Sequence, residues 1–354
     1  MATNSDTRQP GVRVTGRRKV VFALAGISLS VAFTVGALLA VDVYYHDKFE
    51  AAAGLNVRGY RGPTVGRKLS HEQRVFVLGG STAFGYGLSW GDAFPAVLER
   101  KLQEETLAPT TARVVNLAYN NEGAFSFQYT LRDYENLQPD IVVFYTGYND
   151  NGGFNISVFR HQSAVFRLTG YMPILPVILA EKAMAIRYGG DLGAAYAGEK
   201  TVFRPNLAQR TTATAFETAA AISQSLEKQL GRITDTPSAS AVDAAISSCG
   251  RHFVRYCDSV IRAVKDVLDR GRDAVVVTQP YISDLHVAQQ ELLHDILRKR
   301  FGANPALRLV NLGRAVDLKD RELSFDGMHL TARGNELIAD PLVRVIADIV
   351  ARGI

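Results

Sequence analysis

The stretch RVFVLGGSTAFG, residues 74–85, decides the fold class of this chain. Its first part, Arg74–Leu78, is a short apolar run directly before two glycines, which is typical of a buried strand. Glycines permit a tight turn and a close approach of the backbone, so Ser81 is expected at a strand-to-helix turn. A helix is predicted next over Phe94–Glu104, whose apolar residues fall on one face. The stretch therefore begins a strand–turn–helix unit.

The same alternation continues to the end of the chain with one interruption. Further short apolar runs predict strands over Arg113–Leu117, Ile141–Thr146, Ala274–Gln279 and Leu307–Leu312. Helical spacing predicts helices over Phe125–Asn136, His252–Leu268, Leu285–Phe301 and Gly334–Ala351. Short apolar strands separated by helices imply a three-layer α/β/α fold around a mainly parallel five-stranded sheet. In such a sheet ligands bind beyond the carboxyl ends of the strands, so the chemistry is expected in the loops that follow them.

The interruption is an insertion over residues 152–245. Its apolar part, Tyr171–Ala185, is too short and too broken by prolines and charges to span a bilayer. Four roles are open to Tyr171–Leu179: packing against the main sheet, capping the active site, binding an acyl chain or touching the membrane surface. A helix is predicted over Thr211–Leu230, and Pro237–Ser240 is expected to be a flexible linker.

An uncharged run of 22 residues, Val20–Val41, lies near the N-terminus. A helix of this length spans the hydrocarbon core of a bilayer. Five basic residues and one acidic residue precede it within residues 1–19, and three acidic residues follow within residues 42–50. The positive-inside rule then predicts a single-pass helix with a cytoplasmic N-terminus and an extracytoplasmic main domain, periplasmic or extracellular. The alternative is a signal peptide cleaved near Ala40, although the run exceeds the usual apolar region and no clean A-x-A site follows.

These features divide the chain into four segments. A cytoplasmic basic tail is predicted over residues 1–19 and a transmembrane helix over 20–41. A juxtamembrane segment, 42–73, contains many glycines and is expected to be an extended entry. The α/β domain is predicted over 74–354 and contains the insertion.

Composition excludes several classes of protein. With 354 residues, 47% hydrophobic and 21% charged, the chain is foldable and is neither disordered nor collagen-like. The net charge of +5 lies almost entirely in residues 1–19, so we expect no nucleic-acid binding. Two cysteines are too few for a disulfide scaffold or a zinc site made of thiolates. Cys249 and Cys257 can pair outside the cytoplasm if Gly250 breaks the helix between them, whereas a continuous helix holds them about 12 Å apart.

Four polar blocks carry the candidate chemistry: Gly79–Gly85, Asn116–Gly123, Gly147–Asp150 and Asp326–Thr331. The serine block matches neither a P-loop nor the G-x-S-x-G elbow. Asparagine side chains and glycine N–H groups are suitable donors to a developing oxyanion, although the same residues also favour ordinary turns. A serine hydroxyl is a poor nucleophile at neutral pH and needs a general base, which a histidine oriented by a carboxylate supplies.

Taken together and in this order, the four blocks resemble those of the SGNH hydrolases, also called the GDSL esterase/lipase superfamily. The resemblance covers residues 74–150 and 274–350. It implies a flavodoxin-like fold in which Ser81 is the nucleophile, His329 the general base and acid, and Asp326 the carboxylate that orients the histidine.

The resemblance also implies an oxyanion hole, and the sequence departs from the family pattern at two points. The donors would be the backbone N–H groups of Ser81 and Gly123 and the side-chain amide of Asn149. Gly80 replaces the usual aspartate before the serine, which should spare catalysis because that aspartate is not one of the triad residues. The block Asn116–Gly123, which ends at the proposed donor Gly123, is slightly longer than the usual block. No cofactor and no metal are expected.

The leading functional hypothesis is a membrane-anchored extracytoplasmic serine esterase that forms an acyl-Ser81 intermediate. Its partners would be an acyl ester substrate, with acetylated envelope glycans or lipids as candidates by analogy, and the membrane through one helix. The first alternative is a polysaccharide O-acyltransferase that uses the same triad. The second is a non-catalytic module that binds a glycan or a protein partner on this scaffold.

A few further residues outside these blocks have side chains that can serve a function. His286 and His294 lie two helical turns apart, so they are poorly placed to share a metal and are expected at the surface. His161 lies in the insertion and has no predicted role. Trp90 and Phe94 are expected to pack the first helix of the α/β domain, although Trp90 is close enough to the serine block to line a pocket.

Overall fold

The computed structural model describes residues 15–50, 54–105, 111–190, 203–231 and 249–352. The chain divides into two compact units, Met1–Tyr44 and Tyr45–Ile354. The predicted linker Pro237–Ser240 lies outside the described residues.

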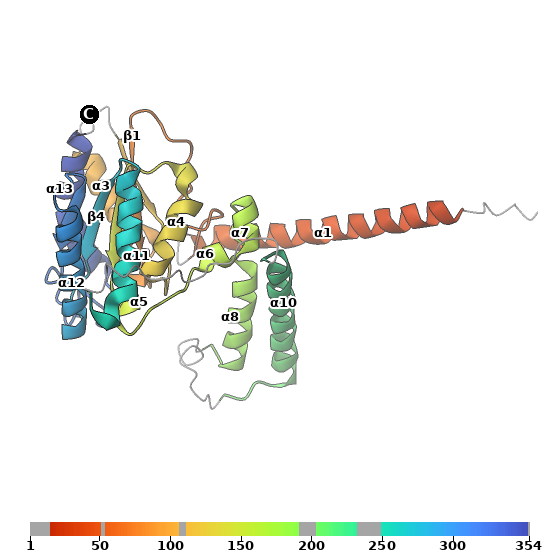
Figure 1. The fold of residues 1–354 in the computed structure, drawn as a ribbon. Coiled ribbons are helices and arrows are strands. Elements are labelled where there is room, and N and C mark those ends of the chain that lie inside the picture. Colours follow the sequence, from red (N-terminus) through yellow and green to blue (C-terminus); the bar gives the residue numbers. More distant parts are fainter. Residues whose placement is uncertain (1–14, 51–53, 106–110, 191–202, 232–248, 353–354) are drawn as a thin grey trace, which may run out of the picture. The chain divides into compact units, whose positions relative to one another are not determined.

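The larger unit is built on a five-stranded sheet in which every neighbouring pair of strands is parallel (Figure 1). Its strand order is β2-β1-β3-β4-β5, the flavodoxin-like order. The strands are β1 (Glu72–Gly79), β2 (Thr111–Asn116), β3 (Ile141–Thr146), β4 (Asp273–Thr278) and β5 (Leu307–Asn311). The predicted fold class is thereby confirmed, and all five predicted strands are present with ends shifted by no more than two residues.

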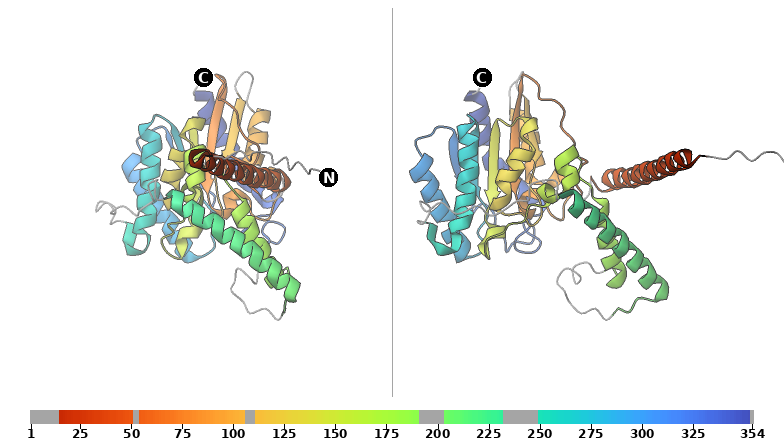
Figure 2. Two further views of the ribbon diagram at one scale, coloured as in Figure 1. Left: turned by 90° about the vertical axis from the view of Figure 1, so that its right-hand side faces the viewer. Right: turned by 45° about the vertical axis from the view of Figure 1, so that its right-hand side comes forward.

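Helices cover both faces of the sheet (Figures 1 and 2). On one side α3 packs against α13, and on the other α11 packs against α4 and α12. The bounds are α3 (Phe94–Glu105), α4 (Phe127–Asp133), α11 (Gly250–Asp269), α12 (Asp284–Phe301) and α13 (Ala332–Arg352). The short elements at the strand ends are α2 (Ser81–Phe84), η1 (Trp90–Asp92), η2 (Ala124–Ser126), η3 (Glu135–Leu137) and α5 (Tyr148–Asn151).

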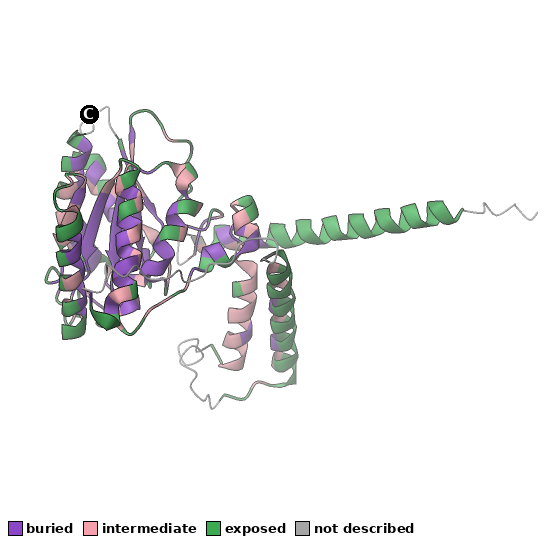
Figure 3. Cartoon of the chain, viewed as in Figure 1, coloured by how far each residue is buried: buried purple, intermediate pink, exposed green. Residues whose placement is uncertain are grey.

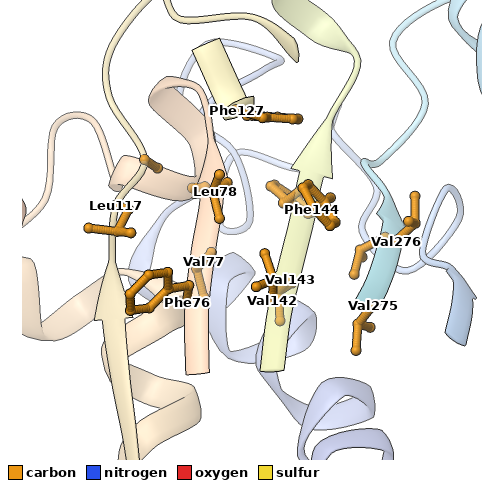
Figure 4. Close-up of a cluster of buried hydrophobic side chains, with 14 of the residues drawn as sticks. Phe76, Val77, Leu78, Leu117, Phe127, Val142, Val143, Phe144, Val275 and Val276 are labelled. Carbon is orange, nitrogen blue, oxygen red and sulfur yellow. The ribbon is translucent and has the colours of Figure 1, made fainter. Parts of the chain in front are cut away.

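The hydrophobic core lies within this sheet and along the inner faces of its helices (Figure 3). Every residue of β3 is buried, and Val77, Val143 and Val276 have no exposed surface. Figure 4 shows such side chains on both faces of the three central strands. Burial on both faces explains why these strands read as continuous apolar runs rather than as alternating ones.

The N-terminal helix α1 runs from Gly16 to Glu50. Over Gly16–Phe49 it is long and apolar enough to cross a membrane, with a mean hydropathy of 2.2 in its most apolar window and none of that window buried. The helix contains the predicted span and continues beyond it into the segment predicted to be juxtamembrane. The described part of that segment after the helix is made of turns up to β1, and Gly59 and Gly62 adopt positive φ angles there.

The insertion forms four described helices (Figure 1). They are α6 (Phe159–Gln162), α7 (Ala164–Thr169), α8 (Leu175–Arg187) and α10 (Leu207–Gly231). Helices α8 and α10 pack against each other, and the exposed Arg187 and Glu217 form an ion pair between them at 2.5 Å. Four roles are open to the stretch Tyr171–Leu179. Its Met172 packs in the main core, and its last five residues form the first part of α8.

The two cysteines form a disulfide, with their Cα atoms 6.4 Å apart. Helix α11 begins at Gly250, which has a φ of +69°, so Cys249 lies outside the helix and Cys257 within it. This is the arrangement on which the predicted pairing depended.

Candidate active site

Ser81 stands at the carboxyl end of β1, where the chain turns into α2. The turn needs the glycine before it, because a β-carbon at Gly79 would lie 2.4 Å from the carbonyl oxygen of Tyr145 on the neighbouring strand. It ends at Gly85, whose φ of +80° is a left-handed conformation that favours glycine. The serine is therefore held in a short turn at the edge of the sheet where ligands bind in parallel α/β folds.

A histidine and an aspartate from the far end of the chain meet this serine. Nε2 of His329 lies 2.8 Å from Oγ of Ser81, although the two residues are 248 positions apart. Nδ1 of the same imidazole lies 2.6 Å from Oδ2 of Asp326. The three side chains thus form a continuous hydrogen-bonded chain with the order that nucleophilic catalysis by serine requires.

The turn around Asp326 keeps its carboxylate ionised and in place. Its Oδ1 accepts backbone hydrogen bonds from His329 at 2.7 Å and from Met328 at 2.9 Å. Partial burial raises the pKa of Asp326, but the hydrogen bonds from the His329 side chain and from these two backbone groups outweigh it, so the pKa is lowered. Behind the turn, the fully buried Ser324 donates to the carbonyl oxygen of His329 and accepts from the N–H of Gly327.

Two exposed aromatic rings flank the imidazole of His329. The ring of Tyr86 lies 4.8 Å away between centroids, and that of Phe325 lies 5.8 Å away and nearly parallel. Both are large apolar side chains left open to solvent, with 50% and 39% of their surfaces exposed. Neither the two rings nor Ser324 could be assigned a role from the sequence, because a single aromatic residue or serine in a loop carries no periodic signal.

The residues predicted for the oxyanion hole also gather beside Ser81. The Nδ2 of Asn149, in α5, donates to the carbonyl oxygen of Glu122 at 2.8 Å. A β-carbon at Gly80 would lie 2.1 Å from the same Nδ2, so the amide lies against the residue that precedes the serine. Within the described ranges, no acceptor is hydrogen-bonded to the N–H of Ser81 or of Gly123.

The close contact with Asn149 gives a physical reason for the glycine at position 80. Any side chain there would displace the amide nitrogen or be displaced by it. Gly123 is constrained in a similar way, because a β-carbon on it would lie 2.6 Å from a carboxylate oxygen of Asp150. Each glycine allows one residue of the Gly147–Asp150 block to approach the backbone of another block.

Asp150 anchors the loop that carries Gly123. Its carboxylate accepts from the N–H of Ala124 at 2.8 Å and, less closely, from Asn155 at 3.4 Å. Burial raises its pKa to about 7, because the backbone donors only partly offset the desolvation of the charged form.

A buried ion pair fixes the other side of that loop. Glu122 and Arg160 are each 3% exposed and approach to 3.2 Å. Burial raises the pKa of Glu122 despite the attraction of Arg160, whose guanidinium also donates to the carbonyl oxygens of Leu117 and Gly59. Arg160 belongs to α6, so the insertion supplies a cation that holds the loop of the second block.

The remaining singled-out residues lie elsewhere. The expectation that His286 and His294 are exposed is wrong: both are buried, because the side of α12 that carries them packs inward, and desolvation lowers each pKa to about 4. Phe94 is buried as expected, whereas the ring of Trp90 lies against Gly62 and lines a cavity with Arg61 rather than the serine site. Over the part of the chain that the structure describes, no group of three or more His, Cys, Asp or Glu side chains is arranged to hold a metal ion.

Comparison with known proteins finds similarity among solved structures. No family model matches the chain, and no curated protein matches it. An acetylxylan esterase from Geobacillus stearothermophilus, in a catalytic mutant form, is 13% identical, with a TM-score of 0.41 over 77% of this chain and 93% of its own. A family 3 carbohydrate esterase from Clostridium thermocellum is 11% identical, with a TM-score of 0.41 over 78% and 99%. A lipolytic protein of the G-D-S-L family from Veillonella parvula is 9% identical, with a TM-score of 0.41 over 77% and 97%.

The resemblance to SGNH hydrolases is supported by features of the chain itself. Its sheet has the flavodoxin-like strand order, and its four blocks meet at one end of that sheet around Ser81. Strand order, block order and the contact between serine, histidine and aspartate all agree with the arrangement that the resemblance to SGNH hydrolases implies.

Proposed function

We propose that this protein is a membrane-anchored, extracytoplasmic serine esterase that hydrolyses acyl esters through an acyl-serine intermediate. The observation that carries the proposal is the hydrogen-bonded chain from Ser81 through His329 to Asp326. The fold alone would serve many functions, but this geometry supplies a nucleophile, a base and a group that orients the base.

The reaction follows from the roles of these groups. Nε2 of His329 takes the proton of Ser81 as Oγ attacks the acyl carbon, and Asp326 stabilises the imidazolium that forms. The N–H groups of Ser81 and Gly123 and the amide of Asn149 donate to the oxyanion. The imidazolium then protonates the departing alcohol. Water, deprotonated by the same imidazole, attacks the acyl-enzyme and releases the carboxylic acid and the serine.

We infer that the alcohol part of the substrate is a sugar. The exposed rings of Tyr86 and Phe325 lie beside the histidine that protonates the leaving group. Exposed aromatic faces bind the apolar faces of flat, otherwise polar rings, and they leave room for a large substrate at the surface. Short acyl esters of glycans, O-acetyl esters among them, fit this arrangement better than a long-chain lipid that needs an enclosed apolar channel.

The alternative of a polysaccharide O-acyltransferase uses the same acyl-Ser81 intermediate. The open aromatic pair supports it too, because a sugar hydroxyl bound there could replace water as the acceptor. Incubating the protein with an acyl donor and a polysaccharide acceptor, and analysing both products, separates the two: free acid identifies the esterase and an acylated polysaccharide the transferase.

Anchoring is the other part of the proposal. The uncharged run Val20–Val41, the basic residues before it and a disulfide in the main domain all support an exported protein held by its N-terminal helix. Alkaline extraction of membranes, combined with N-terminal sequencing of the mature protein, tests it. A soluble product that starts near Ala40 would contradict anchoring and identify a cleaved signal peptide.

The test of the esterase is Ser81→Ala assayed against a panel of short acyl esters, with labelling by a fluorophosphonate probe. The matched control is Ser89→Ala, which removes an exposed hydroxyl eight residues away that makes no capping hydrogen bond. Loss of both labelling and activity in the first variant alone is expected. Activity at the wild-type rate in Ser81→Ala would overturn the proposal.

A further inference from the structure

A second large groove lies in the main unit, lined by residues other than those of the serine site. Its volume is about 890 Å³. Four of the residues that line it are arginines, Arg58, Arg67, Arg132 and Arg167, whereas the only carboxylate among them is Asp133. The lining therefore carries a clear excess of positive charge, which the proposed hydrolysis does not use.

Internal contacts hold one of these arginines in position. The Nη2 of Arg132 lies 2.8 Å from Nε2 of His161, and Nδ1 of His161 lies 2.8 Å from the carboxylate of Asp133. Because an ionised carboxylate only accepts hydrogen bonds, Nδ1 carries the proton and Nε2 accepts from the guanidinium. The histidine thus engages Asp133 and leaves the charge of Arg132 without a carboxylate partner among the described residues.

Contacts with neighbouring residues also hold Arg58 in position. Its carbonyl oxygen accepts a hydrogen bond from the hydroxyl of Tyr134 at 2.7 Å. The guanidinium of Arg58 lies close to Gly170, which has a φ of +67°: a β-carbon added to this glycine would lie 3.3 Å from Nη1 of Arg58. The side chains of Arg58 and Arg67 are exposed and make no ion pair with any carboxylate that the structure describes.

The same wall is tied to the last part of α1. His46 lies 2.7 Å from the carbonyl oxygen of Leu55 through Nδ1 and 2.8 Å from that of Met172 through Nε2. The N–H of Met172 in turn donates to the carbonyl oxygen of Val57, next to Arg58. These contacts lie within the main unit and connect His46, through Met172, to the segment of chain that carries Arg58.

The short stretch of chain between the uncharged run and His46 limits how far the groove can lie from the membrane. Five residue steps separate Val41, the last residue of the uncharged run, from His46. Even a fully extended chain covers only about 18 Å in five steps, whatever the angle between the two units. With the anchor in a bilayer, the groove lies within reach of the headgroups on the extracytoplasmic side.

We propose that this groove binds the phosphate of an anionic phospholipid headgroup in the membrane that holds α1. Guanidinium groups present two parallel N–H donors that match phosphate oxygens, and clusters of arginine next to a membrane span favour anionic lipids. The proposal rests on the anchoring proposed above and not on the esterase activity. Ser81→Ala should therefore bind lipid as the wild type does.

The experiment titrates the full-length protein in neutral detergent with phosphatidylglycerol or phosphatidylcholine and counts bound lipids by native mass spectrometry. The test variant is Arg58→Gln/Arg67→Gln. The matched control, Arg300→Gln/Arg344→Gln, removes the same charge from exposed positions on α12 and α13. We expect a preference for phosphatidylglycerol that weakens at least tenfold in the test variant and stays unchanged in the control.

Three results would overturn the proposal. The first is equal binding of the two lipids by the wild type. The second is unchanged binding of phosphatidylglycerol by the test variant. The third is evidence that the groove binds another anion. Displacement of the lipid by an equal concentration of inorganic phosphate would assign the groove to a free anion. Tight, Arg58-dependent binding of polygalacturonate without any lipid preference would assign it to an acidic glycan.

Discussion

Gly80 and Asn149 touch so closely that a β-carbon on the glycine would lie 2.1 Å from Nδ2 of the amide. We expect Gly80→Ala to fold, since the amide is the far end of a side chain and can rotate away, but to lower kcat. Loss of one oxyanion donor costs about 10²- to 10³-fold, so about 10- to 10³-fold is expected for a displaced one. Steady-state kinetics on a short acyl ester measure the effect. Gly91→Ala, with no atom within 4 Å of the added carbon, is the control and should match the wild type.

Asp326 gives a second prediction. Asp326→Asn should keep the turn, because an amide oxygen can still accept the backbone hydrogen bonds, but it no longer fixes the imidazole proton on Nδ1. A loss of about 10²- to 10⁴-fold in kcat is expected, the upper value being that of a more enclosed triad. Asp295→Asn, at an exposed ion pair on α12, should not change kcat. A similar kcat in both variants would contradict the role proposed for Asp326.

The aromatic pair predicts a difference between substrates. Tyr86→Ala/Phe325→Ala should raise KM for an acetylated oligosaccharide by about tenfold or more, on the scale of about 1 kcal/mol for each aromatic contact. Hydrolysis of p-nitrophenyl acetate, which has no sugar, should change by much less. Equal losses on both substrates would mean that the rings act on the histidine and not on the substrate.

The buried pair of Glu122 and Arg160 predicts an order of stabilities. Arg160→Met should lower the free energy of unfolding by about 3–5 kcal/mol, because it leaves a buried carboxylate without its cation. The double variant with Glu122→Gln should recover part of this loss. Denaturation by urea measures both, and a double variant less stable than Arg160→Met would contradict this account.

The buried histidines predict loss of stability in acid. The pKa values of His286 and His294 fall to about 4 in the folded protein, below the 6.5 expected when unfolded. Above pH 6.5 both histidines are neutral in the folded and in the unfolded protein, so they do not make stability depend on pH there. As the pH drops from 6.5 towards 4, the unfolded state takes up protons that the folded state does not, and the free energy of unfolding falls by up to about 3 kcal/mol for each group. His294→Gln should show a smaller fall of Tm between pH 7 and 5 than the wild type, whereas His71→Gln, at an exposed position, should behave like the wild type.

The parts of this molecule that periodicity encodes could be predicted from the sequence. The five strands follow from runs such as Ile141–Thr146, which are apolar throughout because both faces of the sheet are covered. The meeting of the four blocks follows from parallel topology, because all of them lie at the carboxyl ends of strands or close by. Local sequence patterns and a general rule of sheet architecture are sufficient for both predictions.

What could not be predicted depends on single contacts between distant segments. The sequence does not show that position 80 faces Asn149, or that Arg160 reaches the loop of Glu122 from inside the insertion. The burial of His286 and His294 was missed because α12 carries polar residues on the side that packs inward, where Gln289 and Gln290 are also buried. A polar helix face reads as a solvent face until its partner is known.

The contacts of Arg160 also define how far the protein can be trimmed. One guanidinium joins the entry segment at Gly59, the end of β2 at Leu117 and the helix α4 at Thr130. The first part of the insertion is therefore a structural part of the α/β unit and not an appendage. Met172, packed in the core, extends this indispensable region. A shortened protein would therefore keep the insertion up to Met172 together with the whole of the chain from Cys249 onward. Within the described part of the insertion, the paired helices α8 and α10 are the segment that a protein engineer could remove.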